Sequence, residues 1–426
     1  MTKSMRDHKD RPVVAVTGIG IVTSLGIGKE ENWKKLTAGQ SGLHTITRFP
    51  TEGLKTTVAG TIDFIPADPL CAPALSEEFA MVASKEAIAE AGIGRMGDFP
   101  GPLFVAVPPV EVEWPQRIEI AATSNSDEIG YDEMIRIAGT GRFERYYERF
   151  LYRGTTERLA ERLGTKGSPI ALSTACASGA SAIQLGVEAI RRGESDAALA
   201  IGTDGSVNTE ALIRFALLSA LSTQNEPPQE AAKPFSKNRD GFVMAEGAAV
   251  LVLENLESAR ARGARVLGVI EGCGEMADSF HRTRSSPDGK PIIGCIQNAL
   301  ADAGVAPDDV DYINAHGTGT PENDRMECLG VTAVFGERMP KVAISSNKSM
   351  IGHTLSAAGA VEAAFTLMTL QHQRIPPTIN YKVPDPAIPL DVVPNVARDA
   401  KVRRAISNSF GFGGQNVCLV LGGEPH

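Results

Sequence analysis

The chain has 426 residues, and its content of 42% hydrophobic and 22% charged residues is ordinary for a folded globular protein. This length exceeds what one small core needs, so it favours two domains or two fused halves. A formal net charge of −9 argues against a nucleic-acid binder, because such a protein would carry a basic surface.

The six cysteines are spread over the sequence without a C-x-x-C pair. This spacing indicates neither a disulfide framework nor a zinc site, and it fits a reducing cytoplasm. The polar segment 1–10 lacks the apolar stretch of a signal peptide, and no run approaches the roughly 18 apolar residues of a membrane span. We therefore expect a cytoplasmic protein with no membrane span and no nucleic-acid partner.

The predicted elements begin with a strand at 12–16, which runs into the stretch 17–24. That stretch is similar to a dinucleotide-binding fingerprint, but the third glycine would fall at Thr23. A tight turn with close backbone packing is therefore favoured. The next expected elements are helices at 30–38 and 76–91 and a buried strand at 103–107.

Segment 108–165 departs from this pattern. It holds many of the aromatic and charged residues and has weaker periodicity. We interpret it as an excursion from the core that carries helices of its own. The core resumes with a buried strand at 169–172 and a helix whose apolar positions are Ile183, Val187 and Ile190.

Strands and helices then alternate to the end of the chain. Strands are expected at 196–201, 248–253, 266–271, 312–314, 342–344, 404–408 and 416–421, and helices at 212–221, 292–303 and 357–371. Such alternation implies a mainly parallel sheet covered on both faces. Because the pattern restarts near residue 255, we expect a duplicated α/β architecture with an N-terminal half at 11–255 and a C-terminal half at 256–423.

The stretch 173–180 places Cys176 on a tight turn between the strand at 169–172 and the helix that follows. Small residues on both sides keep its sulfur reachable. Free amide groups at a helix N-terminus lower the pKa of a thiol and favour the reactive thiolate. A buried structural cysteine is the alternative interpretation, and motifs further along the chain decide between the two.

Three polar motifs in the second half carry chemical groups. His316 lies in the loop 314–320, just past a strand, where open α/β sheets place active sites. Lys348 and His353 share one polar stretch before a helix, and the glycine-rich segment 408–416 suggests a loop that moves. A metal site is the other interpretation of paired histidines. We expect none, because there is no H-E-x-x-H pair and no evident carboxylate partner.

These motifs together resemble the β-ketoacyl-acyl carrier protein synthases. The matching segments are T-A-C-A-S-G around Cys176, N-A-H-G-T-G-T-P around His316, S-N-K-S-M-I-G-H-T-L-S-A-A-G with Lys348 and His353, N-S-F-G-F-G-G-Q-N, and the stretch 233–247. They are similar to the Cys-His-His elongating type of the thiolase superfamily, over nearly the whole chain. The resemblance implies two mixed-sheet α/β halves related by a pseudo-twofold axis, in α-β-α-β-α layers, and a homodimer.

The resemblance also implies a decarboxylative condensation. Cys176 would accept an acyl chain from a carrier thioester, since a thiolate is both a good nucleophile and a good leaving group. Malonyl carrier protein would then lose CO2, and His316 and His353 would donate hydrogen bonds to the enolate oxygen. The product would be a 3-oxoacyl-acyl carrier protein, as in fatty acid elongation.

The remaining roles are carried over from the same resemblance. The backbone amides of Cys176 and Phe410 would hold the second oxyanion, and Phe410 would act as a gate. Lys348 would be a buried charge that orients the site, paired with Glu362. The phosphopantetheine arm would be bonded by Thr283, Thr318 and Thr320. No cofactor is implied, because the substrates carry phosphopantetheine on acyl carrier protein.

One departure from the family pattern concerns the acyl pocket. Relatives often have a Gly-rich turn where this chain has the stretch Val107-Pro108-Pro109-Val110. Residues near this turn shape the pocket, so we expect a specialised choice of acyl chain.

A second departure concerns carrier docking. Relatives often carry basic residues where this chain has Ser219 and Gln224, and Glu77 and Glu78 add negative charge. Like charges slow encounter, so a generic acidic carrier should bind weakly. A less acidic carrier, a more apolar contact, or other basic residues would then provide the docking; the candidates among the basic residues are Arg214 and Lys237.

Three alternatives to the elongating enzyme follow from the same motifs. A polyketide-type ketosynthase would use the same chemistry on other chains. A catalytically inactive chain-length partner subunit would typically lack the nucleophile, whereas this chain keeps Cys176. A cysteine hydrolase would release the acyl group to water.

Overall fold

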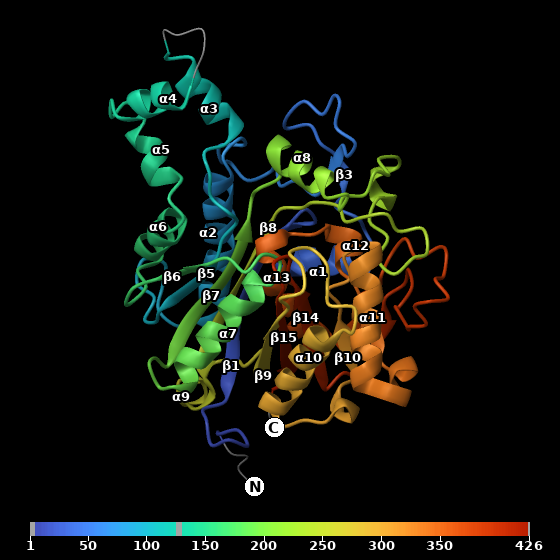
Figure 1. Ribbon diagram of the computed structural model, residues 1–426. Helices are drawn as coiled ribbons and strands as arrows, with labels where there is room; N and C mark the ends of the chain where they lie inside the picture. The colour runs from blue at the N-terminus through green and yellow to red at the C-terminus, as the bar shows by residue number, and fades with distance from the viewer. Residues whose placement is uncertain (1–4, 125–129, 425–426) are drawn as a thin grey trace.

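The computed structural model describes residues 5–124 and 130–424, and one large mixed β-sheet with helices on both faces forms its core (Figure 1). The strand order is β11-β10-β14-β15-β9-β1-β8-β7-β5-β6, with the short strand β2 paired to β1. The strands of the N-terminal half are β1 (Val14–Thr23), β2 (Gly26–Ile27), β5 (Leu103–Ala106), β6 (Ile170–Leu172), β7 (Ala197–Asp204) and β8 (Gly247–Asn255). Those of the C-terminal half are β9 (Gly268–Ala277), β10 (Tyr312–Asn314), β11 (Ala343–Ser345), β14 (Arg404–Phe410) and β15 (Gln415–Gly422).

The other described elements are helices and short strand pairs. The helices are α1 (Lys29–Thr37), α2 (Ala72–Ala91), α3 (Trp114–Ala121), α4 (Tyr131–Ala138), α5 (Glu144–Arg149), α6 (Gly154–Leu163), α7 (Ser178–Arg191), α8 (Thr209–Leu217), α9 (Leu256–Ala261), α10 (Lys290–Ala303), α11 (Pro321–Phe335), α12 (Lys348–Ile351) and α13 (Ala358–His372). Short 3₁₀ helices are η1 (Pro228–Glu230), η2 (Pro307–Asp309), η3 (Gly336–Lys341) and η4 (Leu355–Ala357). The strand pairs are β3 (His44–Thr45) with β4 (Val58–Ala59), and β12 (Arg374–Ile375) with β13 (Arg398–Asp399).

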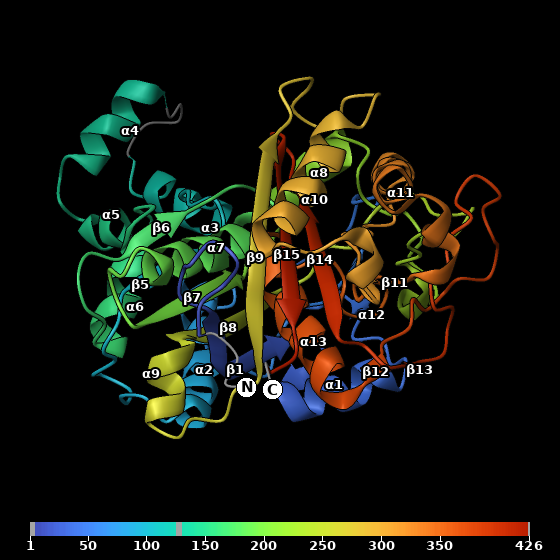
Figure 2. The same ribbon diagram turned by 90° about the horizontal axis from the view of Figure 1, so that it is seen from below.

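The two halves of the sheet repeat one topology and lie side by side (Figure 2). In each half three strands run parallel, β6-β5-β7 and β11-β10-β14. Two antiparallel strands continue each half, β8-β1 and β15-β9, and β1 pairs with β9 to join the halves. The predicted mixed, duplicated α/β fold is confirmed. The expectation of a mainly parallel sheet is wrong, because alternation of helices and strands along the sequence does not fix strand direction.

Helices form three layers around the two halves of the sheet. α2 and α6 cover the outer face of the N-terminal half, and α10 and α11 cover the outer face of the C-terminal half. α7 and α13 contact each other between the halves. The resulting α-β-α-β-α order is the layered arrangement that the sequence predicted.

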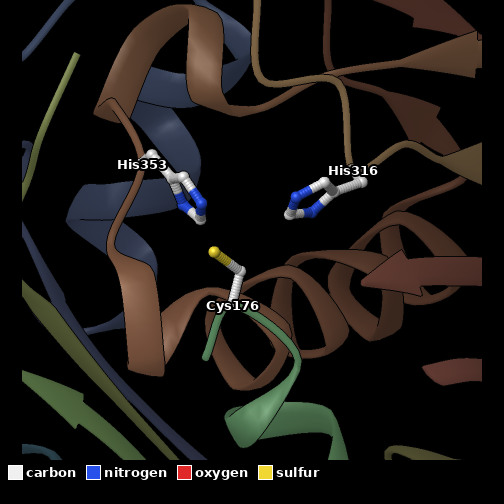
Figure 3. Close-up of side chains that lie close together, drawn as sticks. All are labelled: Cys176, His316 and His353. Carbon is white, nitrogen blue, oxygen red and sulfur yellow. The ribbon is translucent and has the colours of Figure 1, made fainter. Parts of the chain in front are cut away.

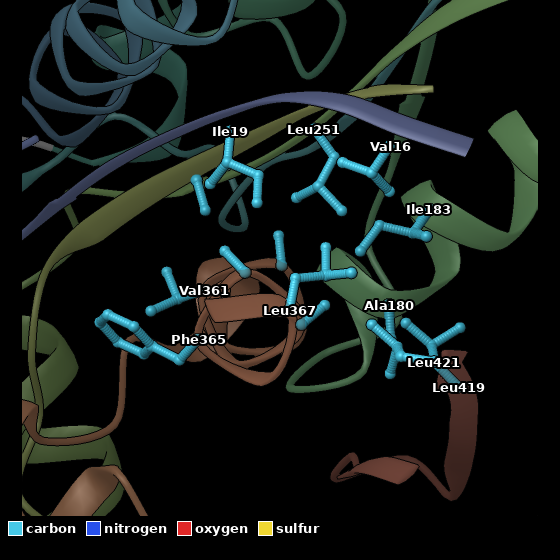
Figure 4. Close-up of a cluster of buried hydrophobic side chains, with 14 of the residues drawn as sticks. Val16, Ile19, Ala180, Ile183, Leu251, Val361, Phe365, Leu367, Leu419 and Leu421 are labelled. Atoms are coloured by element: carbon cyan, nitrogen blue, oxygen red, sulfur yellow. The ribbon is translucent and has the colours of Figure 1, made fainter. Parts of the chain in front are cut away.

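The N-terminal ends of the two central helices approach almost backbone to backbone. A Cβ atom on Gly179 would lie 2.5 Å from the amide nitrogen of Ala360, and a Cβ on Gly359 would lie 2.5 Å from that of Ala180. Larger side chains at these two glycines would force the helices apart. Apolar residues from both helices and both halves of the sheet surround this contact (Figure 4), among them Val16, Ile183, Leu251, Val361, Phe365 and Leu419.

Residues 17–23 of the stretch expected to form a tight turn instead belong to the ten-residue strand β1, and a turn follows only at residues 24–25. Its close backbone packing is confirmed, since a Cβ on Gly18 would lie 2.1 Å from the carbonyl oxygen of Ala87, and one on Gly20 would lie 1.9 Å from that of Ala83. The glycines therefore serve strand-to-helix packing against α2 rather than chain reversal.

Segment 108–165 does form an excursion with helices of its own, of which α3 to α5 project from the core while α6 packs on α2 (Figure 1); its residues 125–129 lie outside the described part. The carboxylate of Glu77 on α2 anchors it. Glu77 is buried and accepts hydrogen bonds from Arg158 (2.6 Å), Arg162 (2.8 Å) and Arg149 (3.4 Å) of the excursion, and Arg162 also contacts Glu78. The expectation that these two glutamates add net negative charge to a docking surface is therefore wrong.

Strand β6, expected to be buried, is the last strand of the sheet, and Ile170 within it is 43% exposed. One edge of β6 carries no neighbouring strand among the described residues. Edge strands with free backbone groups are ready to pair with another chain. No helix in the described part of the chain combines the length and apolar character needed to cross a membrane.

The close contact between α7 and α13 generates a testable prediction. Gly359→Ala should lower the free energy of unfolding by about 1–3 kcal/mol, the usual range for overpacking, although alanine is the better helix former. Thermal unfolding followed by circular dichroism measures this change. Gly423→Ala is the control, because its Cβ would meet no atom within 4 Å. Equal Tm values for the two variants would contradict the close approach.

Candidate active site

Cys176 lies on the turn between β6 and α7. Ala175 before it has a φ of 49°, in the left-handed region that non-glycine residues seldom adopt. Ser178 fastens the turn, since its hydroxyl accepts from the amide of Thr174 (2.7 Å) and donates to the carbonyl of Ala175 (2.6 Å). Cys176 itself is half-buried. The strained turn thus holds the sulfur at the start of the central helix, as the sequence predicted.

Two histidines from the C-terminal half converge on this sulfur (Figure 3). The Sγ atom of Cys176 and one ring nitrogen each of His316 and His353 lie within 4.8 Å of one another. The two imidazole rings meet edge to face, with centroids 5.4 Å apart. Cys176 precedes the start of α7, His316 follows the end of β10, and His353 follows the end of α12. Cys176 therefore shares one site with two histidines that lie more than a hundred positions further along the sequence.

His353 presents its Nε2 atom to the cavity. Its Nδ1 atom accepts a hydrogen bond from the amide of Leu355 (3.3 Å), so the proton of the neutral ring belongs on Nε2. Nε2 is buried and has no hydrogen-bond partner among the described residues. Phe242 packs against the ring with centroids 5.2 Å apart. A buried donor without a partner is one that a substrate oxygen can satisfy.

His316 is held from both sides. Its carbonyl accepts a hydrogen bond from Nζ of Lys348 (2.7 Å), and its Nδ1 lies 3.4 Å from the same ammonium group. On the other side the carboxylate of Glu327 accepts from the amides of His316 (2.9 Å) and Gly317 (2.7 Å). A cation that donates to Nδ1 leaves the ring proton on Nε2. His316 therefore offers a second donor beside Cys176.

Both imidazoles are neutral near pH 7. Burial lowers the pKa of His316 and of His353 well below the usual value, and the nearby charge of Lys348 lowers both further. A neutral imidazole keeps one N–H group, and this group can donate a hydrogen bond to a developing oxyanion. Two such donors in a water-poor site are an arrangement that stabilises an enolate.

Lys348 and Glu362 form a buried ion pair, with the ammonium on α12 and the carboxylate on α13. Burial raises the pKa of Glu362 to about 7, and the Lys348 ammonium opposes that rise. The expected pairing of Lys348 with Glu362 is therefore a direct contact. It holds the Lys348 ammonium next to His316. The pair orients the site, while neither group reaches the sulfur.

Burial raises the pKa of the Cys176 thiol to about 11, while the amide of Phe412 and the charge of Lys348 act in the opposite direction. The expectation that a helix N-terminus lowers this pKa is therefore wrong. α7 begins at Ser178, two residues beyond the sulfur, and desolvation of a thiolate outweighs the few amides that face it. The resting enzyme keeps a protonated thiol.

The glycine-rich segment places its two phenylalanines differently from the expectation. The backbone amide of Phe412, not that of Phe410, acts to lower the pKa of the Cys176 thiol. Phe410 is the buried last residue of β14, in register with Asn416 of β15, and its ring packs on His316 with centroids 5.8 Å apart. Phe412 lies in the loop and is half-buried, so it is the one free to turn aside.

One pocket leads from the surface to Cys176. Thr318 and Thr320 line it with their hydroxyls 3.0 Å apart, and Thr320 also caps α11. Thr283 also lines the pocket, and its amide donates to Nδ1 of His281 (3.1 Å). The three threonines predicted to bond one substrate arm therefore share this pocket.

Sequence reasoning missed Glu327 and Phe412. Glu327 fixes the His316 loop, and burial raises its pKa to about 7. The only signal for it was an acidic residue facing inward in α11, where Asp324 is also fully buried.

Cys176, His316 and His353 are the one described group whose ligand atoms lie close enough to share a metal ion. The group contains no carboxylate. That the site holds no metal stays a prediction.

A cysteine beside two neutral imidazoles is the arrangement expected of a condensing acyltransferase site. Residues 11–259 match the N-terminal domain of the beta-ketoacyl synthases, and residues 267–382 match their C-terminal domain. The chain belongs to the beta-ketoacyl synthase family, and it is an acyltransferase with a thiolase-like fold.

Two curated relatives show the range of the family. The chain is 36% identical to 3-oxoacyl-[acyl-carrier-protein] synthase 2 of Coxiella burnetii, over 96% of this chain and 98% of the relative. It is also 36% identical to the tetracenomycin polyketide synthase ketoacyl synthase alpha subunit of Streptomyces glaucescens, over 98% of both chains.

Solved structures agree with this assignment. A type II polyketide ketosynthase in complex with its acyl-carrier protein has a TM-score of 0.84 and 31% identity, over 97% of this chain and 100% of that one. A beta-ketoacyl synthase from Burkholderia phymatum gives a TM-score of 0.83 and 31% identity with the same coverage.

The raised pKa of Cys176 generates a prediction for alkylation. Because only the thiolate reacts, the rate with iodoacetamide should climb about tenfold per pH unit from pH 7 to pH 10. Intact-mass spectrometry measures the rate, with circular dichroism to show that the fold persists, and Cys176→Ser gives the background from the five buried cysteines. A plateau below pH 8 would show instead a thiol activated in the resting enzyme.

Proposed function

We propose that this β-ketoacyl synthase condenses malonyl-acyl carrier protein with an acyl group held on Cys176, giving 3-oxoacyl-acyl carrier protein and CO2 in fatty acid elongation. The observation that carries the proposal is the convergence of one sulfur and two buried, neutral imidazole donors. The relatives named as 3-oxoacyl synthases support fatty acid elongation, and the polyketide relative supports a second pathway with the same chemistry.

In the first half-reaction the sulfur of Cys176 attacks the carbonyl carbon of the acyl thioester. The thiol proton passes to the departing pantetheine sulfur, so no net charge is left behind. The amide of Phe412, which acts to lower the pKa of the thiol, and that of Cys176 would hold the carbonyl oxygen during this transfer. We assign this oxyanion role to Phe412 in place of Phe410.

In the second half-reaction the bond between CO2 and the malonyl α-carbon breaks, and its electron pair forms an enolate. Nε2–H groups of His316 and His353 donate to the enolate oxygen, a contribution on the order of 3 kcal/mol for each donor. The α-carbon then attacks the acyl carbonyl on Cys176. Collapse of this intermediate expels the Cys176 thiolate, which recovers a proton, and releases the extended chain.

The substrates bring their own prosthetic group in this proposal, so the enzyme needs no cofactor. Phosphopantetheine would enter the pocket with its amides bonded to the hydroxyls of Thr318 and Thr320 and to Thr283. The partner is then acyl carrier protein. The relative seen in complex with an acyl-carrier protein supports this partner for the fold.

We also propose a homodimer in the cytoplasm. The open edge of β6 and the exposed apolar side chains of the adjacent excursion support the dimer, because such groups favour burial against a second chain. These side chains are Trp114, Ile118, Tyr131, Ile135 and Tyr147. Six free cysteines support a reducing compartment.

The nucleophile is tested by Cys176→Ala. The variant should fold but form no acyl adduct, whereas wild type should gain one acyl group per chain when incubated with acyl carrier protein thioester. Intact-mass spectrometry detects the adduct. Cys328→Ala, which changes a buried cysteine outside the site, should still be acylated. An adduct on Cys176→Ala would remove this residue from its role.

The donors are tested by His316→Ala and His353→Ala. Each variant should still accept an acyl group, yet release CO2 from malonyl carrier protein about 100- to 1000-fold more slowly, because one enolate donor is lost. Radiolabelled CO2 release and intact mass measure the two half-reactions separately. His44→Ala, outside the pocket, is the control. Near-normal decarboxylation in either variant would refute its donor role, and release of free fatty acid would indicate a hydrolase.

A further inference from the structure

Two arginines at the mouth of the pocket form no ion pair with a described residue, although the carboxylates of Asp278 and Glu322 line the same pocket. Arg282 and Arg284 lie on loop 278–286 between β9 and α10, on either side of Thr283, and both line the pocket that ends at Cys176. Both are exposed. Neither side chain makes a hydrogen bond or ion pair with any residue in the described ranges. Their charges are therefore available to a ligand.

The backbone beneath these side chains is held firmly. The carboxylate of Asp278 accepts from the amides of Phe280 (2.9 Å) and Ser286 (2.7 Å), which closes the loop. The carbonyl of Arg282 accepts from the amide of Gly413 (2.7 Å), and the amide of Asp278 donates to the carbonyl of Gly414 (2.7 Å). The backbone of the loop thus rests on the glycine-rich segment next to Cys176, while the two arginine side chains remain free.

Two other polar groups considered for docking are already engaged. Arg214 on α8 is ion-paired with Glu111, so its charge is already compensated. The side-chain oxygen of Gln224 accepts from Nζ of the buried Lys233 (2.6 Å). The outer face of α8 presents apolar groups instead, with Leu217 81% exposed. Of the two basic residues considered from the sequence, Arg214 is thereby removed as a free docking charge.

We propose that Arg282 and Arg284 bind the phosphodiester of the phosphopantetheine arm as it enters the pocket. This rests on the proposed function and deepens it, because the threonine-lined pocket leads the arm from Thr283 to Cys176. A guanidinium presents two parallel N–H donors that match phosphate geometry. Two like charges on one short loop repel each other until an anion lies between them. The enzyme then recognises its substrate through the arm, which every carrier shares, rather than through the acidic surface of one carrier.

The test compares three malonyl donors: malonyl-pantetheine without phosphate, malonyl-phosphopantetheine, and malonyl carrier protein. The variant Arg282→Gln/Arg284→Gln should lower the ratio of kcat/KM for the phosphorylated over the unphosphorylated small donor by about 10- to 100-fold, the loss expected for charge-assisted hydrogen bonds. The ratio of kcat/KM for malonyl carrier protein over malonyl-pantetheine should fall by a similar factor. Arg95→Gln/Arg192→Gln, which removes the same charge from exposed sites away from the pocket, should leave both ratios unchanged.

Each remaining outcome has a defined meaning. An unchanged ratio for the small donors overturns the proposal, and a loss confined to malonyl carrier protein shows that the arginines contact the carrier's surface rather than the phosphate. An equal loss with all three donors indicates a structural effect of the substitutions and also overturns it. Calorimetric binding of phosphopantetheine against pantetheine repeats the comparison without turnover. Phosphate-dependent binding in a wild-type enzyme that condenses nothing would keep this site and refute the proposed function.

Discussion

The contact on which the rest of this structure depends is the approach of α7 and α13 at Gly179 and Gly359. Each helix belongs to a different half of the fold, and each begins just after a catalytic loop. Because neither glycine has a side chain, the first turns of the two helices can approach each other backbone to backbone. This approach brings Cys176 beside His353. Gly359 also lies against the side chain of Ser409 on β14, so the strand leading to the glycine-rich segment is positioned by the same contact.

The electrostatic character of the site follows from this tight packing. Water is largely excluded, so charges persist only where they are paired, as Lys348 is with Glu362. Glu327 stabilises the His316 loop through backbone amides without approaching the sulfur. The same exclusion keeps both imidazoles neutral and the thiol protonated. Desolvation therefore favours neutral imidazole donors that can stabilise an oxyanion, and it disfavours the thiolate form of Cys176.

The region around the core decides how substrates arrive. Three arginines of the excursion surround the buried carboxylate of Glu77 and fasten the excursion to α2. The apolar outer side chains of the excursion are exposed. The entrance to the pocket is formed by loop 278–286 and the threonines. The proposed phosphate site and the proposed subunit contact therefore lie on different segments of the chain, loop 278–286 for the first and β6 with the excursion for the second.

The sequence by itself determined the place of Cys176 on a strand-to-helix turn, the positions of the histidine and lysine motifs, the excursion and most helices, because short-range periodicity and motif spacing are written along the chain. It did not determine the direction of the central strands, the burial of Glu77, or which phenylalanine amide faces Cys176. Those features depend on neighbours far apart in sequence. The same is true of the thiol's pKa: a helix N-terminus alone would lower it, but the desolvation that raises it comes from two halves of the fold closing around the sulfur, and only the tertiary structure contains that contact.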